Sequence, residues 1–319
     1  MTVLVLAREF DPTADAVVTA LTEQGVPVFR TDLAAFPTTL RLDARLRDGG
    51  WTGRLWNAHH EVRLEDIRSI WSRGPRTYRF DDSLAPELRE FCYREAKLGV
   101  GGVLAALDVL WANHPNRCAD AVFKPYQWKT AIECGLAVAD TVITNDVGAA
   151  RRFVGDTPGE TITKALGPSG LTEDGQVQVA YTRRLTDADL AELDGVAATA
   201  TTLQRFVPKA FEVRLTVIGQ EMFGVAIHAD TEDARTDWRA DPAALRYELV
   251  STPGPVAEAV AEYMNRTGLV YAGFDFVVTP AGQWVMLEAN TGPQLGFVQA
   301  ATGAPITDAL ATLLAKGTT

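Results

Sequence analysis

The stretch VYAGFDFVVTPAGQWVMLEAN, residues 270–290, holds two apolar segments separated by PAGQ. Proline and glycine favour tight turns, so the stretch predicts a β-hairpin with strands at 270–279 and 284–290. Such hairpins are typical of an antiparallel sheet with one buried face.

The register of this hairpin brings polar side chains together. If Thr279 faces Trp284, then Asp275 lies directly opposite Glu288. Side chains alternate along a strand, so Asn290 lies on the same face as Glu288. We therefore expect two carboxylates and an amide to share one small area of the sheet.

Two neighbouring carboxylates among apolar residues require a cation or a shared proton. Oxygen ligands from Asp275, Glu288 and Asn290 suit Mg²⁺, held together with substrate phosphates. The pair alone leaves two other interpretations open. It fits an ordinary solvated sheet face, and it fits the carboxylate dyad of a glycoside hydrolase, although a dyad would not explain the lysines upstream.

The lysines are few, because only six of the 30 basic residues are lysine. Lys164 lies in TITKAL, where strand alternation places it on the same face as Ile162. A cation beside a buried isoleucine needs an anion. The loop GPSG at 167–170 follows at once, and its amides could cover phosphates.

Further polar residues lie in QRFVPKAFEVRLTVIG, residues 204–219. Glu212 and Arg214 share a strand face there. They predict either a simple ion pair within the strand, or a site with Glu212 on a ribose hydroxyl and Arg214 on a phosphate. Lys124 opens the middle segment on a helix, where a lone lysine is usually solvated.

Composition excludes several classes of protein. The chain has 319 residues, 47% hydrophobic and 22% charged, which is typical of a globular protein of about two domains. Its net charge of −11 argues against a nucleic-acid partner, and no apolar run is long enough for a membrane helix. There is no P-loop, GxGxxG, GxSxG or HExxH motif. Three cysteines without CxxC spacing favour a reducing compartment, so we expect a cytoplasmic protein.

The pattern of elements predicts an α/β fold in three parts. A strand, a helix and a second strand open the chain, at 3–6, 14–24 and 26–29, which favours a parallel sheet. We expect an N-terminal α/β domain at 1–110, a central domain at 111–202 and a C-terminal domain at 203–319.

Taken together, these residues resemble the ATP-grasp superfamily, and within it the graspetide synthetases, which macrocyclise ribosomally made peptides. The resemblance runs from about residue 111 to 314. Its clearest part is NHPNRCADAVFKPYQWKTAIECGLAVADTVITND at 113–146, with matching positions at Asn113, His114, Pro115, Lys124, Gln127 and Thr141. It implies the ATP-grasp fold, in which the central and C-terminal domains enclose ATP.

The resemblance implies ATP and Mg²⁺ as cofactors and gives each site residue a role. The metal ligands would be Asp275, Glu288 and Asn290. The residues expected to bind ATP are Lys124, Lys164, Ser169, Gly170, Gln204, Arg205, Phe206, Val207 and Glu212, where 204–207 meet adenine through the backbone. Arg214 would act on the phosphate side.

For catalysis the resemblance adds Arg239, which would steady an acyl phosphate, and Asp237, which would help to deprotonate the nucleophile. Arg73 and Arg76, with Arg79, lie beside a Gly-Pro turn, where they predict either a site for an acidic core peptide or a solvated loop. Residues 176–200 would hold a leader helix.

The resemblance implies a ligase that activates Asp or Glu side chains of a precursor peptide as acyl phosphates and forms macrocyclic esters or amides. Two alternatives remain: a ligase acting on free amino acids or adding one to a peptide, and a non-catalytic ATP-grasp-like binding protein. A homodimer is left open. The sequence departs from the family pattern at TGPQLGF after Asn290, and at Ser72 and Gly74 in WSRGPRTYRF.

Overall fold

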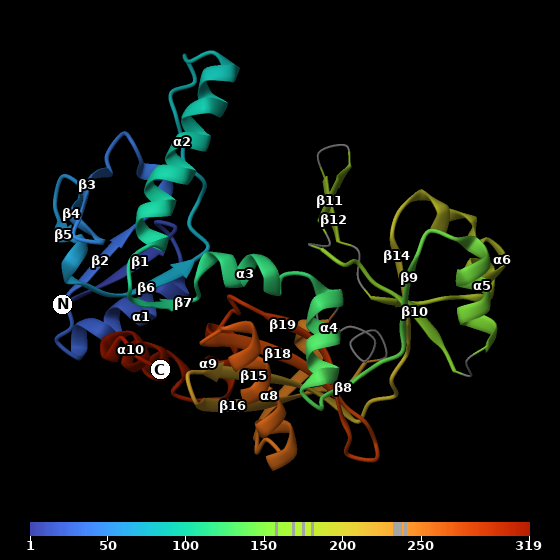
Figure 1. The fold of residues 1–319 in the computed structure, drawn as a ribbon. Coiled ribbons are helices and arrows are strands. Elements are labelled where there is room, and N and C mark those ends of the chain that lie inside the picture. Colours follow the sequence, from blue (N-terminus) through green and yellow to red (C-terminus); the bar gives the residue numbers. More distant parts are fainter. Residues whose placement is uncertain (157–158, 168–169, 174–175, 180–181, 232–237, 239–240) are drawn as a thin grey trace.

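The computed structural model describes residues 1–156, 159–167, 170–173, 176–179, 182–231, 238 and 241–319. The expected α/β fold is confirmed. A parallel sheet, a small four-stranded sheet and a large, mostly antiparallel sheet follow one another along the chain (Figure 1).

The N-terminal part is built on a parallel sheet of order β2-β1-β6-β7. Its strands are β1 (Thr2–Ala7), β2 (Val28–Thr31), β6 (Ile67–Arg73) and β7 (Leu110–Ala112). The predicted β-α-β opening is present, with α1 (Pro12–Glu23) between the first two strands. Asp11 begins this helix because its side chain accepts a hydrogen bond from the backbone N–H of Ala14. The continuous apolar run of β1 is buried on both faces, as expected for a parallel strand.

A three-stranded antiparallel sheet and a long helix cover one face of the parallel sheet. They comprise β3 (Arg41–Arg47), β4 (Gly50–Trp56), β5 (Glu61–Arg63) and α2 (Pro86–Ala105), with short 3₁₀ turns η1 (Leu33–Ala35) and η2 (Leu64–Asp66). The alternating residues at 40–46 and 53–56 predict a hairpin, and β3 and β4 form one. One end of α2 projects well beyond the domain (Figure 1).

The middle of the chain forms a four-stranded sheet of order β13-β10-β14-β9. Its strands are β9 (Thr141–Thr144), β10 (Thr161–Thr163), β13 (Arg183–Arg184) and β14 (Thr201–Arg205); β11 (Gly170–Glu173) and β12 (Gln176–Val179) form a separate pair. Nearby helices are α5 (Val147–Asp156), α6 (Asp187–Ala191) and the 3₁₀ helix η3 (Leu193–Ala198). Ala150, Leu193, Val196 and Leu203 form a small core between α5, η3 and the sheet.

The C-terminal part holds a six-stranded sheet of order β17-β16-β15-β18-β19-β8. Its strands are β8 (Ala137–Val138), β15 (Phe211–Ile218), β16 (Glu221–Ala229), β17 (Leu245–Val250), β18 (Tyr271–Val278) and β19 (Trp284–Asn290). The helices around it are α3 (Pro115–Ala121), α4 (Lys124–Glu133), α8 (Gly254–Thr267), α9 (Gly296–Thr302) and α10 (Ile306–Lys316), with a 3₁₀ turn η5 (Pro242–Ala244).

The two faces of this sheet have different environments. On one face, Val213, Leu215, Phe274 and Phe276 pack in a core with α3, α4 and α8. The other face carries the polar residues of interest, and its far end packs with α9 and α10. Helix α10 also packs against α1, so the C-terminus joins the N-terminal part (Figure 1).

Several elements differ from the sequence expectation. The amphipathic pattern of 113–135 predicts one helix, but the structure has two, because α3 ends near Val122 and α4 begins anew with Pro125 in its first turn. The sequence also predicts strands at 160–166 and 176–185; the first is the shorter β10, and the described parts of the second are β12 and β13. The two-residue β8, the three-residue β7, the edge strand β17 and the short helix α9 were not predicted, because elements this short show little periodicity.

Asn113 fastens the start of α3 to the six-stranded sheet. It is buried, and its Oδ1 accepts from the N–H groups of Val270 (2.8 Å) and Tyr271 (3.1 Å). Its Nδ2 donates to the carbonyls of Tyr271 (2.6 Å) and Thr291 (2.9 Å). One side chain therefore holds both ends of the β18–β19 hairpin. No described helix has the length and apolarity that crossing a bilayer would require.

Replacing Asn113 tests this connection. Asn113→Ala leaves four buried backbone groups without their partner, so we expect the free energy of unfolding to fall by about 3 kcal/mol. Urea unfolding followed by tryptophan fluorescence measures this. Asn116→Ala, at an exposed site in the first turn of α3, is the control and should change stability by less than about 0.5 kcal/mol. Equal stability of the two variants would contradict the prediction.

Candidate functional site

The β18–β19 hairpin pairs Asp275 with Glu288, as predicted. The register near the turn is shifted by one residue from the expectation, since Val278, not Thr279, faces Trp284. A β-bulge between the Phe276 and Asp275 pairs absorbs the difference.

The bulge places one extra residue, Leu287, in β19. Met286 and Ala289 both point into the apolar core. The side chains of Leu287 and Glu288, which lie between them in sequence, therefore both point to the other face of the sheet. Leu287 lines the pocket described below and Glu288 lies beside it. The hairpin thus supplies an apolar wall and a carboxylate from consecutive residues.

Asp275 is held in a buried ion pair with Arg214. Their strands β18 and β15 place them directly opposite each other, and Arg214 Nε lies 2.8 Å from Asp275 Oδ1. Only 7% of the Arg214 side chain and 6% of the Asp275 side chain are exposed. Asn290 Nδ2 donates to Asp275 Oδ2 at 3.1 Å, so the amide shares this face as expected.

Glu288 is paired with Lys124 in the first turn of α4, where the ammonium donates to the carboxylate. Helix α4 is fixed on β19 by two further side chains. Gln127 exchanges hydrogen bonds with the backbone N–H and C=O of Ala289, both at 2.9 Å, and Trp128 Nε1 donates to the carbonyl of Leu287 at 2.8 Å. The position of Lys124 is therefore tied to the carboxylates.

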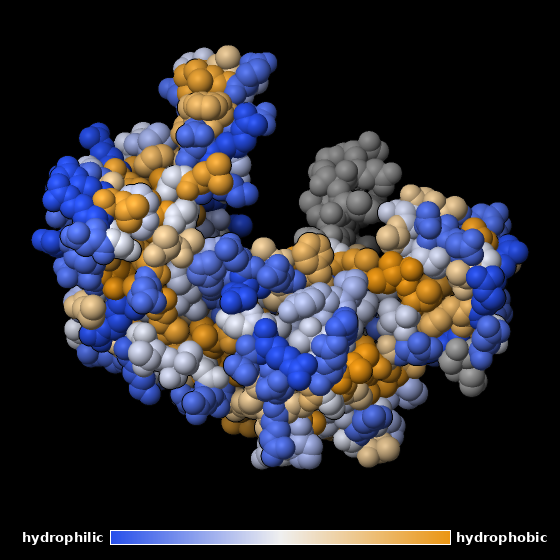
Figure 2. All heavy atoms as spheres, in the orientation of Figure 1, coloured by the Kyte–Doolittle hydropathy of each residue, from blue (hydrophilic) through white to orange (hydrophobic). Residues whose placement is uncertain are grey.

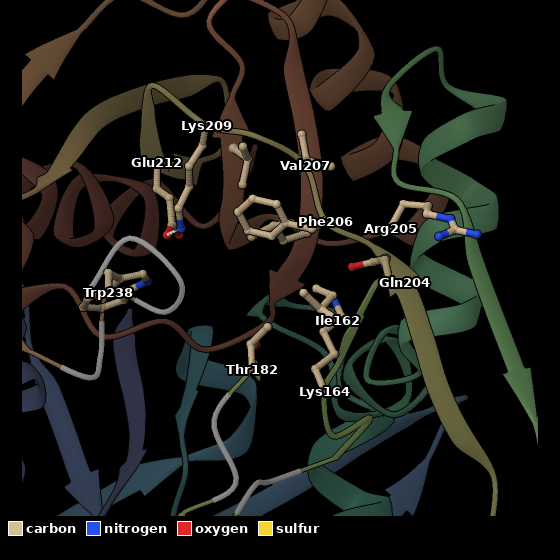
Figure 3. A pocket seen from close by; sticks show the side chains of 12 residues that line it. Ile162, Lys164, Thr182, Gln204, Arg205, Phe206, Val207, Lys209, Glu212 and Trp238 are labelled. Carbon is tan, nitrogen blue, oxygen red and sulfur yellow. Dashed lines mark hydrogen bonds and ion pairs between the residues drawn. The ribbon is translucent and has the colours of Figure 1, made fainter. Parts of the chain in front are cut away.

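A pocket with about 530 Å³ of empty space opens between the four-stranded and six-stranded sheets. Strand β10 and the residue after it supply Ile162 and Lys164, and β18 and β19 supply Val277 and Leu287 (Figure 3). The remaining lining residues are Thr182, Gln204, Arg205, Phe206, Val207, Lys209, Glu212 and Trp238. Most of the residues expected to bind ATP are thus brought together.

The connection between β14 and β15 runs along one wall of this pocket. Gln204 Nε2 donates to Thr141 Oγ1 at 2.7 Å, and Phe206 stacks under the guanidinium of Arg184 at 4.0 Å. The Arg205 guanidinium points away from the pocket (Figure 3) and donates to Thr161 Oγ1 at 3.0 Å. Arg205 therefore faces the pocket with its backbone alone, which agrees with the role expected of 204–207.

The buried ion pair of Glu212 is with Lys209, not with Arg214 on its own strand. Lys164 lies over the ring of Trp128 at 5.1 Å from its centroid. The described part of the site therefore contains four cations and three carboxylates. The cations are Lys124, Lys164, Lys209 and Arg214, and the carboxylates are Glu212, Asp275 and Glu288. The described part of the site is net positive in a chain of net charge −11, which suits an anionic ligand.

Three expected residues, Ser169, Asp237 and Arg239, lie outside the described residues. Gly170 is the first residue of β11. Trp238 stacks on Phe297 of α9 with ring centroids 5.6 Å apart. The centroid of the Phe297 ring lies 5.9 Å from the Arg214 guanidinium.

Arg73 and Arg76 have structural partners. Arg73 pairs with Asp11 at 3.6 Å and donates to Gln294 Oε1 at 2.8 Å, with only 10% of its side chain exposed. Arg76 donates to Asp32 Oδ2 at 2.7 Å, and this contact raises the pKa of the Arg76 guanidinium. Arg79 is exposed.

The loop 291–296 after Asn290 is fixed from several sides. Besides Arg73, the Tyr271 hydroxyl donates to the carbonyl of Pro293 at 2.8 Å. Burial raises the pKa of Tyr271, so the hydroxyl stays protonated and keeps this bond. A Cβ on Gly273 would lie 2.6 Å from Pro293, so the close approach of the loop requires glycine there.

Sequence reasoning missed Lys209, Trp238 and Leu287. Lys209 could have been identified from the sequence, because it is one of only six lysines and lies three residues before Glu212, with which it pairs. Leu287 could not be found, because its direction depends on the bulge.

The donor set fits a hard cation. Asp275 and Glu288 are opposite each other, and Asn290 contacts Asp275, so all three can offer oxygen atoms to one ion. Within the described part of the chain there is no cluster of three or more His, Cys, Asp or Glu side chains suited to a metal. The candidate set differs from such clusters because its third member is an amide.

Comparisons with known proteins agree with this geometry. A family model described as the MvdD pre-ATP grasp domain matches residues 2–118. Among solved structures, the macrocyclase MdnC of Microcystis aeruginosa MRC, bound with precursor peptide MdnA, is 25% identical, with a TM-score of 0.83 over 98% of this chain and 99% of that one. The macrocyclase MdnB of the same organism is 26% identical, with a TM-score of 0.78 over 98% of each chain.

A third structure agrees in fold. It is a Chryseobacterium gregarium RiPP-associated ATP-grasp ligase, solved with ADP and with a leader and core peptide, and it is 23% identical with a TM-score of 0.89. The match covers 98% of this chain and 96% of that one. No curated protein sequence matches the chain.

The contacts of Arg73 predict a structural role that Arg79 does not share. Arg73→Ala leaves the partly buried Asp11 carboxylate without its cation and removes the hydrogen bonds that hold the loop 291–296, so we expect a loss of about 2 kcal/mol in the free energy of unfolding. Arg79→Ala should leave stability unchanged. Thermal unfolding of both variants checks this. If Arg73→Ala is as stable as wild type, the contacts of Arg73 with Asp11 and the loop 291–296 do not contribute to stability.

Proposed function

We propose that the chain is an ATP-grasp ligase of the graspetide-synthetase type, which activates Asp or Glu side chains of a ribosomally made precursor peptide and joins them to a hydroxyl or an amine of the same peptide. One observation supports this most directly. The pocket between the two sheets is lined by Val277 and Leu287 of β18 and β19, the two strands that also pair Asp275 with Glu288.

The nucleotide would lie in this pocket. The backbone of 204–207 would meet adenine, and Glu212 would accept a hydrogen bond from a ribose hydroxyl. Lys124, Lys164 and Arg214 would bind the phosphates, and the net positive charge of the site supports this. The loop with Ser169 and Gly170 belongs to the same proposal, as does the division into domains at about 110 and 202.

Mg²⁺ would be held by Asp275, Glu288 and Asn290. When bound, it offsets phosphate charge and helps to orient the phosphates. Two of these ligands are paired with cations of the site, Asp275 with Arg214 and Glu288 with Lys124.

The reaction has two steps. A carboxylate oxygen of the peptide attacks the γ-phosphorus of ATP, the bond to the bridging oxygen breaks, and ADP leaves. The acyl phosphate is then attacked by a Ser or Thr hydroxyl or a Lys amine, and phosphate leaves with the electron pair. Arg214 would stabilise the charge of the transferred group, because preorganised cations act most strongly in a buried site. We assign Arg239 to the acyl phosphate and Asp237 to the nucleophile's proton.

The precursor peptide is the proposed partner. The MdnC structure contains a precursor peptide, and the Chryseobacterium ligase structure contains a leader and a core peptide. The proposal includes leader binding near 176–200 and contact of the acidic core with Arg76. It also includes a homodimer and a cytoplasmic location. Arg73 is less suited to the core peptide than expected, because its side chain is occupied by Asp11 and Gln294.

The direct test uses purified protein, ATP, Mg²⁺ and the peptide encoded beside its gene. Each bond formed should lower the peptide mass by one water. Free amino acids replace the peptide in a parallel assay, and activity with them alone would favour the rival ligase. Nucleotide binding without any turnover would favour a binding protein.

Asp275→Asn should abolish modification. The amide keeps the shape and can still accept from Arg214, but it removes the charge that a metal requires. Asp275→Ala is less suitable, because it would leave the Arg214 guanidinium buried and unpaired. We expect a loss of about 10³-fold in kcat, measured by mass spectrometry. Glu221→Gln, at an exposed site on β16, is the control and should behave like wild type. Wild-type turnover by Asp275→Asn would exclude the metal role.

Glu212→Gln should act on affinity instead. A carboxylate accepts a hydrogen bond from a hydroxyl more strongly than an amide does, and Glu212 lies away from the reacting phosphate in this proposal. We expect KM for ATP to rise about tenfold while kcat changes little. Steady-state kinetics with varied ATP separate the two effects, and a fall in kcat with constant KM would argue against ribose binding.

A further inference from the structure

Trp128 of α4 contacts a residue from each wall of the pocket. It is buried, with 6% of its surface exposed, and its Nε1 donates to the carbonyl of Leu287 at 2.8 Å. The centroid of its ring lies 5.1 Å from the Lys164 ammonium. Leu287 and Lys164 both line the pocket, one from the six-stranded sheet and the other from the residue after β10 (Figure 3). Helix α4 itself lies at the floor of a hollow between α2 and the four-stranded sheet (Figure 2).

The ring of Trp128 has a fixed orientation. Its N–H is bonded to the backbone of β19, and Gln127, the preceding residue, is bonded to the backbone of Ala289 in the same strand. The contact between the ring and Lys164 therefore relates a cation of one wall to the strand that carries Glu288.

The contact also differs in kind from those of the other two lysines of the site. Lys124 is paired with Glu288 and Lys209 with Glu212, so a carboxylate lies beside each of these cations. An aromatic ring attracts an ammonium through its π electrons and carries no net charge. Trp128 thus holds Lys164 without adding a negative charge where an anionic ligand would bind.

A buried tryptophan is often a core residue and nothing more. Trp284 of β19 is an example, because it is 8% exposed and its ring packs on Phe276 at 5.3 Å in the apolar core. Trp128 differs because its ring faces a cation that lines the pocket.

We propose that Trp128 is a positioning residue for nucleotide binding, which holds the Lys164 ammonium in place for the phosphates of ATP. This inference rests on the proposed function, in which Lys164 binds those phosphates. Trp128 acts through Lys164 and does not itself touch the nucleotide.

The test measures the Kd of ATP in the presence of Mg²⁺ by isothermal titration calorimetry, after thermal unfolding has confirmed that each variant is folded. Trp128→Leu keeps an apolar side chain but removes the ring, so Kd should rise about tenfold, as expected for a desolvated cation–π contact. Trp128→Phe keeps a ring face and should stay within about threefold of wild type. Trp284→Leu is the control for loss of a buried tryptophan and should leave Kd unchanged.

A double-mutant cycle separates positioning from a general loosening of α4. Lys164→Met removes the cation, so adding Trp128→Leu to it should weaken ATP binding little further. An equal loss with and without Lys164 would show that Trp128 only stabilises the helix, and the inference would be wrong. A wild-type Kd for Trp128→Leu would also exclude it.

The outcomes distinguish this inference from the proposed function. If wild type binds ATP but does not modify the precursor peptide, the proposed ligase activity is wrong, while the cycle still decides the role of Trp128. If wild type does not bind ATP, both are wrong.

Discussion

The buried pairing of Arg214 with Asp275 is the constraint on which the site depends. Two charges with side chains less than a tenth exposed are costly to desolvate, and the cost is offset only when their geometry is held closely. Here the geometry is set by the sheet, because β15 and β18 place the two residues opposite each other. The core on the other face, with Phe274 and Phe276, keeps that register fixed. A functional centre is thus stabilised by packing on the side of the sheet that it does not occupy.

The same hairpin illustrates how a local irregularity serves a site. A regular strand would place Leu287 and Glu288 on opposite faces, and only one of them could border the pocket. The bulge lets Leu287 line the pocket while Glu288 pairs with Lys124, and Met286 and Ala289 remain in the core. The carboxylate therefore stands beside an apolar wall, where a bound phosphate would be partly shielded from water and its interactions with cations would be stronger.

The sequence predicted the central pairing of the hairpin, but less of the framework around it. Apolar alternation and a Pro-Gly turn predicted that Asp275 faces Glu288, although the register at the turn was wrong by one residue. Lys209 and Arg73 were harder, because an arginine or lysine in sequence does not reveal its partner. Arg73 looked like a peptide ligand beside a Gly-Pro turn, yet its partners Asp11 and Gln294 are distant in the chain.

The side chains that connect distant segments also determine how the site can move. The loop 291–296 is bound to the N-terminal part through Arg73 and to β18 through Tyr271, and Asn113 binds its first residue. The four-stranded sheet meets the site through Ile162 and Lys164 as well as through the connection at 204–209, and Lys164 reaches the Trp128 ring of α4. The carboxylates are therefore held by contacts within the six-stranded sheet and α4, whereas the opposite wall of the pocket comes from a separate sheet.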